Sequence, residues 1–240
     1  MMYKNAADWI PEFDKYRHIS FDLWLTLIKS HPEFKPKRNQ LYKDYFKIDK
    51  PIEEVASVIR KFDLLTNSIN EKVGRNFDTF EIFYLILDGL SVNISNYGQK
   101  ELQEFYNLND EILMQYKPVL LHDTIPAFLK EIYDNGKSLN ILSNTAFIKG
   151  NSLRNIISHY GLDEYFAFQL YSDETGYSKP APEMYGYAYN EIQKINTIAK
   201  NEVLHVGDNR LSDYYGAMNF GFNAHLIINT TTNESKLQPA

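Results

Sequence analysis

Cysteine, net positive charge and long apolar runs are all scarce or missing in this chain. None of the 240 residues is cysteine, which excludes disulfides and thiolate metal sites and is compatible with the cytoplasmic location that we expect. The 31 acidic residues outnumber the 25 basic ones, so the formal charge is -6. Nucleic acid and anionic membranes are therefore not expected as partners. No stretch approaches the roughly 20 apolar residues of a bilayer span, so we expect neither membrane insertion nor secretion.

What remains is an ordinary globular composition, with 44% hydrophobic and 23% charged residues. A chain of this length can bury a full core, either as one large domain or as a core domain with a smaller insert. The pattern favours the second arrangement, because its character changes along the chain. We predict a core domain from residues 1–30 and 115–240 and a helical insert over 31–114.

Strand-like and helix-like segments alternate in the predicted core domain. The run HISFDLWLTL, His18 to Leu27, is typical of a buried strand, and strands are also expected over 138–144, 165–171 and 203–207. Helices are expected from Asp123, as a capping residue, to the stop at Gly136, and over 152–159 and 181–194. This alternation predicts an α/β fold with a mainly parallel sheet. The polar end of the chain, 229–240, is expected to be a loosely held tail.

The insert has a different pattern, in which apolar residues recur at helical spacing. Val55, Ile59, Phe62 and Ile69 form one stripe, and Phe80, Phe83, Tyr84 and Leu87 form another. The many Tyr and Phe residues here are expected to be core, with an aromatic lining for a partly apolar substrate as a weaker hypothesis.

Polar residues gather at the carboxyl ends of four predicted strands. They are Asp22 with Thr26, Ser143 with Asn144, Lys179, and Asp208 with Asp213. In a parallel sheet these ends converge on one crevice. Taken singly, each cluster has a structural explanation, because Asp, Asn and Ser are common in turns and helix caps.

The order of these clusters resembles the haloacid dehalogenase superfamily, most of whose members are phosphatases. FDLWLT, ILSNT, SKPAPEMY and VGDNRLSD resemble the four motifs of that family, with a helical insert after the first, and the resemblance spans roughly Ile19 to Leu226. It implies a Rossmann-like parallel sheet with an all-helical cap, and a small phosphorylated molecule as substrate. The oligomeric state is left open.

The resemblance also implies roles for the clustered residues. Asp22 would be the nucleophile that forms an aspartyl phosphate, and Lys179 would supply positive charge to it and to the phosphate. Thr26, Ser143, Asn144 and Lys179 would bind the phosphate. Mg²⁺ prefers oxygen ligands, which would come from Asp22, Asp208 and the backbone carbonyl of Trp24, with Asp213 in support or acting through water. His205 is expected to be a core or supporting residue instead of a ligand.

Two positions depart from the family pattern. Phosphatases of this family carry an aspartate two residues after the nucleophile as general acid and base, whereas this chain has Trp24, which can do neither. The usual glycine before the threonine is replaced by Leu25. The missing acid and base removes a factor on the order of 10² to 10⁴ in rate.

Three explanations for Trp24 stay open at this point. The chain could be a phosphatase whose leaving group needs little protonation, such as an acyl phosphate, or whose acid comes from His31 or Glu33. It could be a binding or regulatory module in which Trp24 fills the crevice. It could also be a dehalogenase, since halide leaves without a proton. The complete set of acidic residues favours the phosphatase first and the module second.

Overall fold

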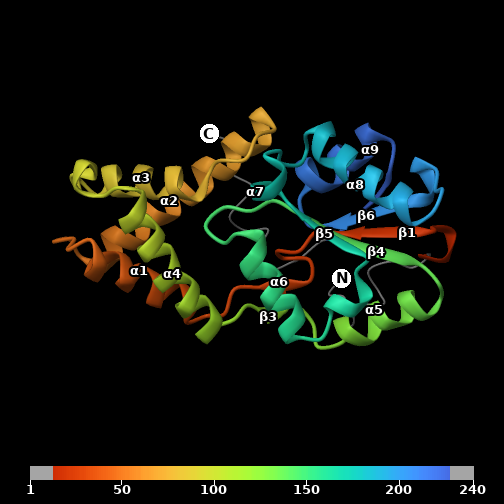
Figure 1. The fold of residues 1–240 in the computed structure, drawn as a ribbon, viewed down its shortest axis with the longest axis horizontal. Helices are drawn as coiled ribbons and strands as arrows, with labels where there is room; N and C mark the ends of the chain where they lie inside the picture. The colour runs from red at the N-terminus through yellow and green to blue at the C-terminus, as the bar shows by residue number, and fades with distance from the viewer. Residues whose placement is uncertain (1–12, 228–240) are drawn as a thin grey trace.

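A parallel sheet with helices on both faces forms one end of the molecule, and four further helices form the other end (Figure 1). The computed structural model describes residues 13–227. Strands β1 (His18–Phe21), β4 (Ser138–Ser143), β5 (Phe168–Tyr171), β6 (Val203–Gly207) and β7 (Asn223–Leu226) are ordered β5-β4-β1-β6-β7, and all neighbouring strands are parallel. The predicted α/β class is confirmed. Within the described residues, no helix has the length and apolar character needed to cross a bilayer.

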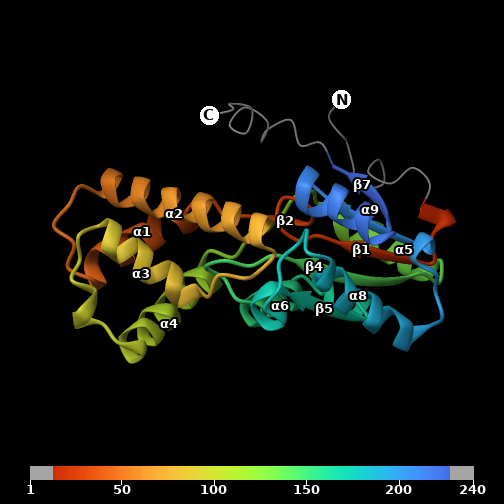
Figure 2. The same ribbon diagram turned by 90° about the horizontal axis from the view of Figure 1, so that it is seen from above.

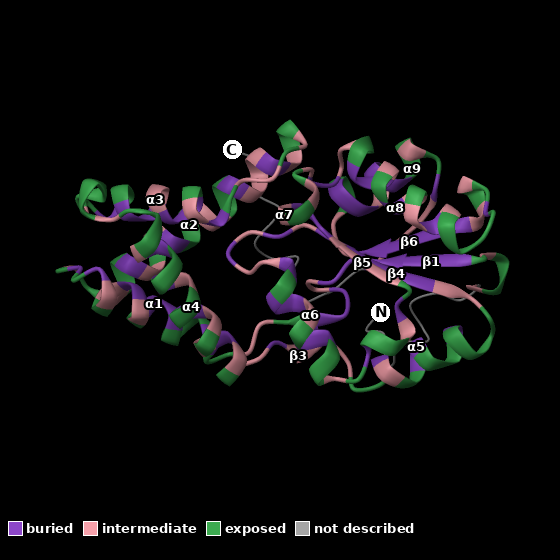
Figure 3. Ribbon diagram, viewed as in Figure 1, coloured by how far each residue is buried: buried purple, intermediate pink, exposed green. Residues whose placement is uncertain are grey.

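The sheet is parallel because each of its strands returns through a helical crossover. Helices α5 (Ile125–Asp134) and α6 (Gly150–His159) cover one face, and α8 (Pro182–Ile195) and α9 (Gly216–Phe220) cover the other. Short helical turns join them: η2 (Phe13–Lys15), η4 (Asp163–Tyr165), α7 (Ser172–Thr175), η5 (Lys200–Glu202) and the π-helical η6 (Arg210–Tyr215). Strands β1 and β6 are buried along their whole length, as Figure 3 shows, and their polar residues His18, Ser20 and His205 are buried with the apolar ones.

The insert consists of helices packed on one another, which Figure 2 shows beside the sheet domain. They are α1 (Phe34–Tyr45), α2 (Ile52–Val73), α3 (Thr79–Gly89) and α4 (Gln99–Gln115), with the turn η3 (Ile94–Asn96). Tyr42, Phe83 and Phe105 are fully buried in a core of their own, with the Tyr42 and Phe105 ring centroids 4.5 Å apart. The aromatic residues of the insert are therefore mainly core. The boundaries at 31 and 114 stay a prediction.

Some local predictions were wrong. The first strand ends at Phe21 and not at Leu27, because Leu25 has a φ of +59°, which turns the chain into a tight loop. A two-stranded antiparallel ribbon, β2 (Ile28–Lys29) with β3 (Val119–Leu120), then joins the sheet domain to the four helices. Asp123 does not cap α5, since Thr124 takes the N-cap position and no side chain caps that end. The predicted tail at 229–240 lies outside the described residues.

Candidate functional site

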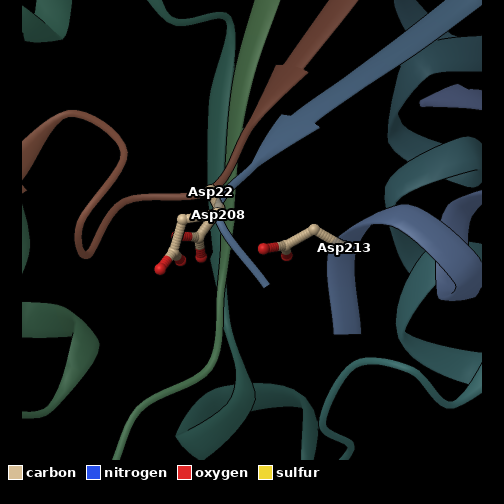
Figure 4. Close-up of side chains that lie close together, drawn as sticks. All are labelled: Asp22, Asp208 and Asp213. Carbon is tan, nitrogen blue, oxygen red and sulfur yellow. The ribbon is translucent and has the colours of Figure 1, made fainter. Parts of the chain in front are cut away.

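The carboxyl ends of three adjacent strands bring the sequence motifs together. Asp22 follows central strand β1, Ser143 ends β4 on one side, and Asp208 follows β6 on the other. The backbone N–H of Asp22 donates to the carbonyl of Val206 (2.9 Å), which extends the β1–β6 pairing up to the site. Figure 4 shows Asp22 and Asp208 beside each other at these strand ends, with Asp213 pointing toward them from η6.

Lys179 is the cation that joins these carboxylates. Its Nζ donates hydrogen bonds to Asp22 Oδ1 (2.9 Å), to Asp213 Oδ1 (2.7 Å) and to the carbonyl of Leu142 (2.5 Å). The side chain is 1% exposed, so these three acceptors replace the water that an ammonium group would otherwise bind. Burial lowers the pKa of Lys179, but Asp213 and Asp22 outweigh it and keep the group protonated.

The environment of Asp22 differs from that of Asp213. Burial raises the pKa of the Asp22 carboxyl above its ordinary value, although Lys179 opposes the shift. Burial acts on Asp213 in the same direction, but Lys179 and His205 outweigh it and hold its pKa below the ordinary value. Asp22 also accepts a hydrogen bond from Thr26 Oγ1 at its second oxygen, Oδ2 (3.1 Å). Asp22 is therefore the more basic of the two carboxylates.

Asp213 is held in place from several sides. Its Oδ2 accepts from the backbone N–H of Asn209 (2.9 Å), and His205 Nε2 lies 3.3 Å from Oδ1. Burial lowers the pKa of His205, so the ring is neutral, with Nδ1 3.0 Å from the hydroxyl of Ser20. Gly207 is required beside it, because a Cβ there would lie 2.3 Å from the Asp213 carboxyl carbon. The burial of His205 and its contact with Asp213 agree with the expectation of a core or supporting residue.

The carboxylate groups of Asp22, Asp208 and Asp213 could hold a metal ion, since their oxygens lie within 4.8 Å of one another. The three carboxyl groups face a single ammonium group, that of Lys179. A divalent cation prefers oxygen ligands and would add positive charge to this acidic cluster. The donor set therefore fits Mg²⁺.

The predicted pair Ser143 and Asn144 lies at the end of β4, and both side chains form hydrogen bonds with backbone groups. Ser143 Oγ donates to the carbonyl of Asn144 (3.3 Å). The side-chain amide of Asn144 donates to the carbonyl of Lys179 (2.9 Å) and accepts from its N–H (2.7 Å). Asn144 thus braces the loop that carries Lys179, and its phosphate-binding role stays a prediction.

A cleft of about 240 Å³ lies between the sheet and the helices α1 and α2. Trp24 and Asn144 line it from the sheet, Phe34 and Arg38 from α1, and Phe147 from the loop after β4. His31 and Glu33 do not line this cleft; the His31 ring contacts Tyr116 instead, with centroids 5.7 Å apart. A role for either residue as a replacement acid stays a prediction.

Helix α2 also contacts the loop after β6 directly. Glu71 Oε1 accepts hydrogen bonds from Asn209 Nδ2 (2.6 Å) and from Ser212 Oγ (2.9 Å). Neither Glu71 nor Arg38 was identified from the sequence. Each is one charged residue on a helix that carries many, and no local pattern separates the charges that face the site from those that face water.

Comparison with known proteins agrees with this geometry. Residues 16–221 match the haloacid dehalogenase-like hydrolase family, so the chain belongs to that family and is a hydrolase. It is 27% identical over 182 residues to a glyceraldehyde 3-phosphate phosphatase of Pyrococcus furiosus, a match that covers 70% of this chain and 71% of that protein. An uncharacterised hydrolase of Schizosaccharomyces pombe is 29% identical over 107 residues, which is 43% of this chain and only 45% of the yeast protein.

A solved structure extends the likeness to nearly the whole fold. The HAD hydrolase YfnB of Bacillus subtilis, solved with bound magnesium, has a TM-score of 0.64 over 87% of this chain and 87% of its own. The two sequences are 16% identical, so this likeness shows the fold alone. The predicted parallel sheet with an all-helical cap is confirmed.

Proposed function

We propose that this hydrolase is a Mg²⁺-dependent phosphatase of small phosphorylated metabolites, with Asp22 as the nucleophile. The observation that carries the proposal is that buried Lys179 donates hydrogen bonds to both Asp22 and Asp213, with the half-buried Asp208 beside them. A structural ion pair would need one carboxylate for one ammonium. Three carboxylates fit a site that holds a metal cation, and the bound cation together with Lys179 would neutralise the charge of an incoming phosphate.

In the proposed reaction, a carboxylate oxygen of Asp22 attacks phosphorus while the bond from phosphorus to the leaving oxygen breaks. The product is an aspartyl phosphate. Water then attacks the phosphorus while the bond from phosphorus to the Asp22 oxygen breaks, which restores the carboxylate. Both protons of the water stay on the released inorganic phosphate, so this step needs no base from the protein. Lys179 neutralises charge on the phosphoryl oxygens, and the hydroxyl groups of Thr26 and Ser143 and the backbone amides after β4 are the proposed hydrogen-bond donors.

Mg²⁺ would be held by Asp22, Asp208 and the backbone carbonyl of Trp24. Asp213 belongs in a supporting position or behind a bound water, because Lys179 and the amide of Asn209 already occupy its oxygens. When bound, the cation polarises the phosphoryl oxygens and offsets the repulsion between Asp22 and an anionic substrate.

Trp24 restricts the leaving group. With no general acid at this position, the site favours substrates whose leaving group is stable without a proton, and an acyl phosphate meets this requirement. Dehalogenation is the second candidate, because halide also leaves without a proton. The three clustered carboxyl groups, which could hold a cation, and the phosphatase relative over 70% of the chain support phosphate first.

The test is release of inorganic phosphate from a panel of acyl and sugar phosphates with Mg²⁺, compared with chloride release from short 2-chloroacids. We expect phosphate release, fastest from acyl phosphates, and its loss in D22N. Asp163→Asn, an exposed aspartate on η4, is the control for the loss of one charge. Phosphate release that survives D22N, or chloride release alone, would overturn the proposal. No turnover at all would favour the binding module.

A further inference from the structure

Arg38 is a buried cation that forms no ion pair with any described carboxylate. Its side chain is 8% exposed, and no described carboxylate lies within 4.0 Å of its nitrogens. Its hydrogen bonds run from Nε and Nη2 to the same oxygen, Asn39 Oδ1 (3.3 and 3.1 Å). Asp63 acts on this guanidinium electrostatically but forms no ion pair with it, so the planar donors keep the capacity to bind an anion in the cleft.

The guanidinium lines the same cleft as Trp24 and Asn144, so it faces the space next to the catalytic end of the sheet. The guanidinium lies 5.1 Å from the centroid of the Phe147 ring and 5.9 Å from that of Phe34, and these contacts fix its orientation.

The charges around Arg38 leave the cleft electropositive on this side. Lys35 also lines it, at an exposed position one turn earlier on α1. The cleft contains one carboxylate, Asp63, but Arg60 Nη1 already pairs with its Oδ2 (2.7 Å) and Asn67 donates to its Oδ1 (3.2 Å). Asp63 attracts Lys35 and Arg38 electrostatically but forms an ion pair with neither, so both can bind an incoming anion.

We propose that Arg38, assisted by Lys35, binds a carboxylate of the substrate, so that the substrate class is a short phosphorylated carboxylic acid. The inference rests on the proposed function, which places the phosphoryl group of the substrate at Asp22. A planar guanidinium matches a carboxylate in two parallel hydrogen bonds, and the cleft of about 240 Å³ suits a molecule of a few carbon atoms. The phosphate end meets Asp22, and the carboxylate end meets α1.

The test uses two ligands that differ only at the carboxylate. These are 3-phosphoglycerate and glycerol 3-phosphate, which share a three-carbon skeleton. Their inhibition constants against acetyl phosphate hydrolysis are measured with Mg²⁺, and their affinities for the D22N protein are measured by calorimetry, which does not need turnover. We expect 3-phosphoglycerate to bind at least about tenfold more tightly, since hydrogen bonds to charged groups are the stronger ones.

Two variants separate recognition from packing. R38M should reduce the preference for 3-phosphoglycerate to near unity, and R38K, which keeps the charge but not the planar pair of donors, should reduce it several-fold. R154M is the matched control, because Arg154 lies 5.0 Å from a ring centroid, that of Tyr171, but is paired with Glu174 away from the cleft. If R38M does not fold, R38K decides the question.

Each outcome distinguishes the inference from the proposed function. Equal binding of the two ligands by the unmodified protein, or an equal loss of both in R38K, would overturn the role of Arg38 even if phosphate is released. Selective binding of the carboxylate ligand in D22N, without phosphate release by the unmodified protein, would support Arg38 and overturn the phosphatase.

Discussion

The side-chain amide of Asn144 holds the backbone of Lys179 from both sides, as donor to its carbonyl and acceptor from its N–H. The end of β4 thereby sets the position of a cation that enters from a loop 35 residues later in the chain. The precision of the Lys179–Asp22 contact depends on this support.

Asn144→Ala is expected to lower kcat by roughly tenfold or more, because Lys179 loses its fixed position. The free energy of unfolding should fall by about 1 to 3 kcal/mol, since two partly buried hydrogen bonds are lost. Phosphate release and urea unfolding measure the two effects. Asn135→Ala, at the exposed end of α5, is the control. An unchanged kcat would show that Lys179 does not need this support.

Trp24 offers an optical test of the metal and phosphate site. Adding Mg²⁺ with beryllium fluoride, a phosphoryl mimic, should change the emission of Trp24, because the mimic binds at Asp22 two residues away. The measurement uses a Trp9→Phe background, as Trp9 is the other tryptophan and lies outside the described residues. D22N should abolish the change. A flat response in the background protein would contradict binding at this site.

Leu25 occupies a left-handed conformation where the family pattern has glycine. Leu25→Gly is expected to be more stable than Leu25→Ala by about 1 kcal/mol, because only glycine has no steric penalty at positive φ. Urea unfolding of both variants measures the difference. At Gln103, an exposed position within α4, the alanine variant should instead be more stable than the glycine variant, because alanine favours a helix. A more stable alanine variant at 25 would contradict strain there.

His18 makes the stability of the sheet depend on pH. Burial lowers its pKa to about 4, against a weaker opposite effect of the hydrogen bond with Asn140. The unfolded chain therefore binds more protons than the folded one between pH 4 and 6.5. The contribution of His18, up to about 3 kcal/mol, is present above pH 6.5 and is lost as the pH falls toward 4.

The check is urea unfolding of the unmodified protein and of H18Q across this range. The difference in unfolding free energy should shrink as the pH falls, while His205 and His225 titrate alike in both proteins and cancel. A difference that stays constant with pH would contradict the assignment to His18.

The sheet and most of its elements could be predicted because their signals are local. The strand over 203–207 was predicted with the bounds of β6, and the helix over 181–194 differs from α8 by one residue at each end. Asp22, Ser143 and Asp208 lie at strand ends as the sequence predicts, and the parallel topology brings them together. Lys179 was predicted at a strand end too, but it lies in the loop between α7 and α8.

Other features depend on contacts between distant segments. The function of Asn144 as a brace for Lys179 is invisible without the fold, since an Asn after a strand is common in turns. The buried state of Arg38 depends on Phe147, which is more than a hundred residues away in the chain. The early end of β1 depends on the φ of Leu25, a residue that does not by itself predict a left-handed turn.

The hydrogen bonds from Asn209 and Ser212 to Glu71 join α2 to the loop after β6, which carries the acidic residues of the site. A change in the position of α2 is therefore coupled to a change in the shape of that loop. Thermodynamic reciprocity then applies to their ligands. A molecule that fixes the helices over the sheet must strengthen cation binding by a certain factor. The cation must strengthen the binding of that molecule by the same factor. The substrate would in this way help to load the ion that its own conversion requires.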